Sequence, residues 1–161
     1  MLLVGGSESE CFGVLTDTAS QSAQPLWEIS GGFRGLSVLP DRVVLACETA
    51  RYQDGVVQKQ IKLFSYGSSD FSQLGKTTVL RGLSDLSSGA FAAASDGTVY
   101  LLKGSEPNIL YTTEDVAESS EEKIQSLVPF CDLEEPISEL VAAPLERRRL
   151  FSFSVGRVME S

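Results

Sequence analysis

Histidine is absent from this sequence, although cysteine, serine and carboxylate side chains are present. Without histidine the chain lacks the commonest general base and the commonest protein ligand of metal ions. Ser–His–Asp and Cys–His catalysis cannot be assembled from its own residues. We therefore expect no catalytic site, no metal site and no cofactor, and a chain that is not an enzyme.

The three cysteines, Cys11, Cys47 and Cys131, are widely spaced and form no CxxC pair. An odd number of cysteines at such spacing is typical of buried thiols in a reducing compartment rather than of a disulfide framework. Free cysteine packs as a small apolar side chain. The cysteines therefore favour an intracellular location, in the cytoplasm or the nucleus.

Acidic residues form short clusters, and paired carboxylates can hydrolyse glycosidic bonds. The clusters are Glu8/Glu10, Glu114/Asp115, Glu118/Glu121/Glu122 and Glu134/Glu135. Because these acids lie in serine-rich, loop-like segments, we interpret them as solvated. Residues 114–136 are interpreted as an acidic insert, suited to partner binding or to phosphorylation at Ser119 and Ser120.

The segment Gly75-Lys76-Thr77-Thr78 resembles the end of a phosphate-binding P-loop. Asp70 stands where that motif requires its first glycine, and a carboxylate there would repel a phosphate. We interpret the segment as a turn that leads into an outer strand.

Aromatic and arginine residues are the candidates for protein contacts, because they dominate binding hot spots. The candidates are Trp27, Arg34, Tyr52, Arg147, Arg148 and Arg149. Trp27 is also suited to the core or to an interface between sheets. The three consecutive arginines are the only basic run, and before an apolar strand they are more typical of a solvated loop or of residues that protect an edge strand than of a contact site.

Short β-strands must position these residues, because alternating or β-branched runs are broken throughout by Gly, Ser, Asp and Pro. Only residues 114–127 and 136–145 have a pattern that would hold a turn or two of helix. Strands centred near Val14, Ile61, Val99 and Val158 recur at spacings of about 47, 38 and 59 residues. Propeller blades recur every ~40–50 residues.

We therefore expect an all-β fold, a single segment of roughly three to four propeller blades, each a four-stranded antiparallel sheet. The blades are predicted at 1–30, 31–81, 82–113 and 137–161, with the acidic insert between the last two. Closed propellers contain about 4–8 blades, and an open ring exposes a strand edge. The chain is thus expected to be a fragment, or to be completed by another chain.

Three stretches resemble the WD40 family. ASDGTVYLL (94–102) is similar to the middle of a WD40 repeat, where a small-residue strand turns through Asp-Gly into an aliphatic strand. QIKLFS (60–65) is similar to the third strand, with Phe64-Ser65 in place of Trp-Asp, and SVLPDRVVLAC (37–47) to the passage from first to second strand. The family's Gly-His pair and Trp-Asp dipeptide are missing. The resemblance implies a degenerate propeller that serves as a protein-binding scaffold.

The net charge of −9 disfavours direct nucleic-acid binding, and no run approaches the ~20 apolar residues of a membrane span. The first residues, MLLVGGSESE, lack the basic region of a signal peptide. We expect a non-catalytic subunit of an intracellular multiprotein complex, whose protein partners contact the loops 51–59 and 114–135. One alternative is a small self-contained β-sandwich or barrel that binds a ligand or partner. A propeller hydrolase that uses carboxylates ranks behind both.

Overall fold

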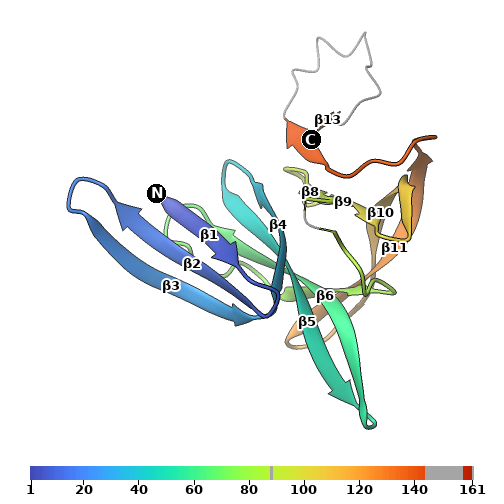
Figure 1. Cartoon of the computed structure of the whole chain (residues 1–161), viewed down its shortest axis with the longest axis horizontal. Helices are drawn as coiled ribbons and strands as arrows, with labels where there is room; N and C mark the ends of the chain where they lie inside the picture. Colours follow the sequence, from blue (N-terminus) through green and yellow to red (C-terminus); the bar gives the residue numbers. More distant parts are fainter. Residues whose placement is uncertain (88, 144–157, 161) are drawn as a thin grey trace.

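The chain is built from β-strands. We describe a computed structural model over residues 1–87, 89–143 and 158–160. In these residues every regular element is a strand, so the predicted all-β class is confirmed. Residues 114–127, whose pattern predicts a turn or two of helix, instead form the end of β10 (Glu106–Glu118), a turn and the start of β11 (Glu122–Asp132) (Figure 1).

An N-terminal sheet of three strands lies to one side of the molecule (Figure 1). Its strands β1 (Leu2–Gly6), β2 (Glu10–Asp17) and β3 (Ser22–Ser30) follow one another in sequence order and pair antiparallel. Short polar turns connect them, which is the usual form of a β-meander.

The main body is a sheet of eight strands in the order β4-β5-β6-β7-β11-β10-β9-β8. The strands are β4 (Gly32–Val38), β5 (Arg42–Gln53), β6 (Val56–Gly67), β7 (Thr77–Arg81), β8 (Phe91–Ala93), β9 (Val99–Lys103), β10 (Glu106–Glu118) and β11 (Glu122–Asp132). Neighbouring strands are antiparallel except β7 and β11, which are parallel. This one parallel pair joins the β4–β7 meander to the β8–β11 meander.

The two outer strands of this sheet, β4 and β8, meet and nearly close it into a barrel. The amide of Gly89 donates to the carbonyl of Arg34 at 3.0 Å, and the amide of Ala93 donates to Ser37 Oγ at 2.8 Å. A small parallel pair, β12 (Val141–Ala143) with β13 (Val158–Glu160), follows in the chain. The edge strands β4 and β8 therefore cover each other where they meet.

The barrel interior is filled by aliphatic and small side chains. Ile61, Leu80, Leu86 and Leu101 are almost completely inaccessible to solvent and belong to one cluster. An eight-stranded barrel has an interior just wide enough for side chains to fill. The interior is therefore a packed core.

A second cluster lies between the N-terminal sheet and the outer face of β5. In the run Val43–Cys47, Val44 and Ala46 belong to the barrel core. Val43, Leu45 and Cys47 belong to the second cluster. Both faces of β5 are thus covered, which explains its continuous apolar sequence.

The predicted grouping into four-stranded blades is not confirmed. The described strands form sheets of three, eight and two strands, and the segments 31–81 and 82–113 contribute to one continuous sheet. The reason is that β7 and β11 pair with each other, so these two segments share one hydrogen-bonded ladder. The fourth predicted blade, 137–161, lies largely outside the described residues.

Two segments predicted as loops are strands. Residues 51–59 lie in the β5–β6 hairpin around a turn at Asp54–Gly55, and 114–136 contains the end of β10 and all of β11. The loop prediction is wrong for both segments because the polar residues of a half-exposed strand resemble those of a loop. Pairing with a neighbouring strand determines the structure there.

Candidate protein-binding site

The β5–β6 hairpin extends beyond the sheet (Figure 1). β4 pairs with β5 only as far as Glu48, and β7 pairs with β6 only from Ile61. Between these limits, within the described part of the chain, residues 49–60 pair only with each other, from Thr49 opposite Gln60 to Gln53 opposite Val56. We call residues 49–60 the arm.

The end of the arm is a two-residue turn. Asp54 and Gly55 both have positive φ, 52° and 79°, as a type I′ turn requires. Asp-Gly is among the sequences that favour this turn, and its twist matches that of the flanking strands. The arm is therefore a regular hairpin with a defined register.

Apolar side chains are exposed near the turn. Tyr52 is 74% exposed and Val57 is 62% exposed. These two residues are directly opposite each other across the hairpin, so they lie on the same face. Val56, on the other face, is 58% exposed. The arm thus presents an aromatic ring and two β-branched side chains to solvent.

A groove of about 500 Å³ lies between the base of the arm and the end of β7. Arg51, Lys59 and Arg81 line it together with Gln58 and Gln60. Lys59 is 3.3 Å from a Glu48 oxygen. Among the residues that the structure describes, no carboxylate lines the groove.

Trp27, a predicted contact residue, is packed within the second cluster. Its ring stacks on Tyr66 with centroids 4.7 Å apart and an interplanar angle of 8°. A Cβ at Gly13 would lie 2.5 Å from the Trp27 ring, so glycine at that position makes room for the indole. The structure thus supports the packing interpretation of Trp27.

Arg34, another predicted contact residue, is bound within the chain. Its guanidinium contacts a Glu48 carboxylate oxygen at 3.0 Å, and the two side chains are 20% and 13% exposed. It also donates to the carbonyl of Phe33 at 3.0 Å. Arg34 therefore links β4 to β5 near the base of the arm.

Of the described candidates, Tyr52 alone is exposed. The other three, Arg147, Arg148 and Arg149, lie outside the described residues. The structure does not bring Trp27, Arg34 and Tyr52 into one site. It adds Val56 and Val57, which lie in the predicted partner-facing segment 51–59 but were not named as contact residues. The Asp-Gly pair before these two valines is a hairpin pattern that could have indicated them. The structure also adds Arg81, for which the sequence carried no signal.

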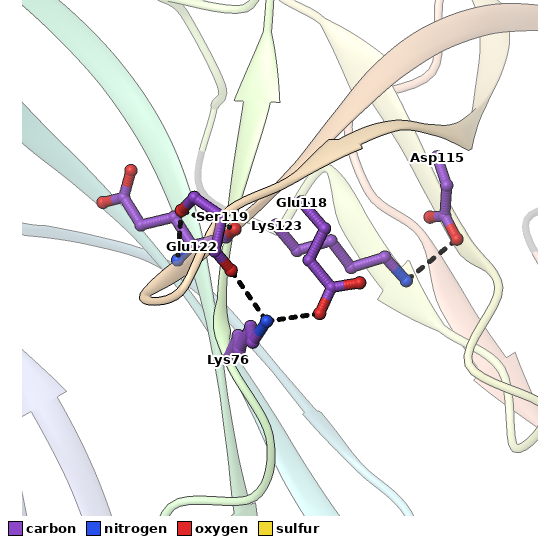
Figure 2. A network of polar contacts seen from close by, with 6 residues as sticks. All are labelled: Lys76, Asp115, Glu118, Ser119, Glu122 and Lys123. Atoms are coloured by element: carbon purple, nitrogen blue, oxygen red, sulfur yellow. Dashed lines mark hydrogen bonds and ion pairs between the residues drawn. The ribbon is translucent and has the colours of Figure 1, made fainter.

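Lysine side chains form ion pairs with acidic residues of the β10–β11 hairpin. Figure 2 shows Lys76 between the Glu118 carboxylate and the Ser119 carbonyl, which is 2.7 Å from Nζ. Lys123 contacts Asp115 at 3.0 Å. The hydrogen bond from Lys76 lowers the pKa of the Glu118 carboxyl. Ser119 Oγ donates a hydrogen bond to the Glu122 carbonyl and accepts one from the Glu122 amide, so this hydroxyl stabilises the turn between β10 and β11.

Cys11 and Cys47 are in contact within the second cluster. Their sulfur atoms are 3.2 Å apart, and both residues are buried. Burial raises the pKa of both thiols above the ordinary value of 9.0. Cys131 is exposed on β11. Burial thus keeps Cys11 and Cys47 as thiols at neutral pH.

Within the described residues, no three His, Cys, Asp or Glu side chains are grouped to hold a metal ion. None of the described elements is a helix that could span a lipid bilayer. No family model, curated protein or solved structure matches this chain.

Proposed function

We propose that this chain is a protein-binding module that contacts its partner through the arm. The observation that carries the proposal is the exposure of Tyr52, Val56 and Val57 on a hairpin that projects from the sheet. Aromatic side chains dominate binding hot spots, and clustered exposed apolar residues mark interaction surfaces. A regular hairpin presents them with little loss of conformational entropy on binding.

The packed barrel interior supports a role in binding at the surface. Its apolar side chains, such as Ile61 and Leu101, occupy the space in which other barrels enclose a ligand. Contact between β4 and β8 supports a self-contained domain, which was the alternative to the propeller. We propose that this domain serves as a non-catalytic scaffold within an intracellular assembly, where Cys11 and Cys47 remain reduced.

The proposal is tested by copurification of proteins with the intact native chain and with two variants. Tyr52→Ala removes the exposed ring of the arm. Val38→Ala is the matched control, because Val38 is also highly exposed but lies at the end of β4. Thermal unfolding of both variants checks that the fold is retained.

We expect Tyr52→Ala to reduce the recovered partner at least tenfold, which corresponds to about 1.4 kcal/mol of binding free energy. We expect Val38→Ala to recover as much partner as the unaltered chain. Equal recovery with Tyr52→Ala would contradict a role for the arm.

A further inference from the structure

The outer edge of β6 within the arm has no strand beside it in the described part of the chain. β7 pairs with β6 only over Ile61–Leu63, and the chain then turns away at Gly82, whose φ is 76°. Residues Val56–Gln60 pair with β5 on their other side. This edge is therefore available to an additional strand.

The turn geometry indicates which backbone groups face this edge. In a two-residue hairpin the residues flanking the turn, here Gln53 and Val56, hydrogen-bond to each other. Successive residues then direct their backbone groups to opposite sides. The N–H and C=O groups of Val57 and Lys59 consequently face the open edge.

The groove beside this edge is positively charged. Arg51 and Arg81 take part in no ion pair within the described part of the chain. Val79 pairs with Lys62, and Arg81 is two residues after Val79. The Arg81 side chain therefore lies on the same face of the sheet as Gln60 and Gln58. Arg51 is directly opposite Gln58 on that face. Arg51, on the neighbouring strand β5, and Arg81 thus both line the groove beside the open edge, in a chain whose net charge is −9.

We propose that this groove binds an acidic peptide in extended conformation, which adds to β6 as a strand. The inference rests on the proposed role of the arm and states the chemistry of its partner. Backbone groups of Val57 and Lys59 would form the ladder, as in other strand-addition complexes. Carboxylates at alternate peptide positions would lie near Arg51 and Arg81.

The open edge limits the size of the occupant. Five residues, Val56–Gln60, span roughly 16 Å at about 3.3 Å per residue. A peptide segment of about five residues therefore fills it. A nucleic acid has no peptide groups and cannot form a backbone ladder with a strand. The unpaired N–H and C=O groups of the open edge therefore favour a peptide.

The test is fluorescence anisotropy of a labelled ten-residue peptide that alternates Glu and Val, with a Lys/Val peptide as the charge control. The unaltered chain is compared with Arg81→Glu, which reverses one groove charge. Arg42→Glu is the matched control, because Arg42 begins β5 at the end opposite the arm. Val57→Pro removes one edge N–H without a change in charge.

We expect the acidic peptide to bind the unaltered chain more weakly as salt rises, and the basic peptide not to bind. Arg81→Glu should weaken binding at least tenfold and Val57→Pro several-fold, whereas Arg42→Glu should change it less than twofold. Absence of binding by the acidic peptide, or equal binding by Arg81→Glu, would overturn the proposal.

A labelled oligonucleotide serves as the competing probe. Tighter binding of the oligonucleotide than of the acidic peptide, with the same dependence on Arg81, would overturn the proposal in favour of a phosphate site. If the peptide fails to bind while Tyr52→Ala still removes the copurified partner, only the acidic-peptide inference fails. If Tyr52→Ala has no effect, the proposed function of the arm fails.

Discussion

At the scale of single residues, contact between the N-terminal sheet and β5 depends on a few side chains. Trp27 lies over Gly13 and stacks on Tyr66, and beside them the Cys11 and Cys47 sulfur atoms are in contact. The sequence predicted either a partner contact or a core role for Trp27, and buried roles for the cysteines, because these residue types pack well. Cys11 and Cys47 are buried as predicted, but the prediction is wrong for Cys131, which lies on an exposed part of β11. It could not predict that Cys11 and Cys47 meet, since pairing between sheets depends on the whole fold.

Alkaline pH should destabilise the protein through these thiols. Burial raises the pKa of Cys47 in the folded state above the ordinary value of 9.0, and raises that of Cys11 as well. Above its pKa in the unfolded chain, each thiol ionises in the unfolded state while it stays protonated in the folded state, which favours unfolding. The stability is therefore complete below the thiol pKa of the unfolded chain and is lost as pH rises. We therefore expect the free energy of unfolding to fall above about pH 9.

Urea unfolding at a series of pH values from 7 to 10.5 measures this fall. Cys47→Ala should make the alkaline fall shallower, although it also lowers stability at pH 7 by leaving a small cavity. Cys131→Ser, which alters an exposed cysteine, should leave the pH profile unchanged. A profile that stays flat to pH 10.5 in the unaltered chain would rule out burial of the thiols.

At the scale of elements, the sequence predicted many strands well and their partners poorly. Alternation and β-branched residues correctly placed strands at, for example, 43–47 and 60–65, because these patterns report which faces are buried. The parallel pairing of β7 with β11 joins residues more than 40 positions apart, and no local pattern records it. ASDGTVYLL forms a hairpin turn, a feature that WD40 repeats share with antiparallel sheets in general.

The turn of the arm should tolerate only residues that accept positive φ. Gly55 has φ of 79°, and nothing lies within 4 Å of a Cβ placed there. Gly55→Ala should therefore destabilise the protein by about 1–2 kcal/mol through backbone strain alone. Gly55→Asn should cost less, because asparagine accepts this conformation more readily.

Chemical denaturation of both variants measures these differences. Peptide binding by Gly55→Ala should also weaken, since a distorted turn changes the register that directs Val57 and Lys59 outward. Equal stability of the alanine variant and the unaltered chain would show that the turn is not of type I′.

At the scale of the whole molecule, the main sheet curls until β4 meets β8, and the N-terminal sheet covers one part of its outer face. The sequence predicted that the apolar strands belong to propeller blades, whereas the two faces of β5 are covered by the barrel core and by the N-terminal sheet. The arrangement could not be predicted because strand sequences specify buried faces without identifying what buries them. The arm could not be predicted from the sequence, because it is defined by where β4 and β7 stop pairing with β5 and β6, and these pairings are not local.

Residue-resolved amide hydrogen exchange tests the barrel and its open arm most directly. The amides of Gly89 and Ala93, which donate across the β4–β8 contact, should be protected, and so should those of Gln58 and Gln60, which face β5. The amides of Val57 and Lys59 should exchange at rates near those of an unstructured chain. Rapid exchange at Gly89 and Ala93, or strong protection at Val57 and Lys59, would contradict a nearly closed sheet whose arm has an unpaired edge on β6.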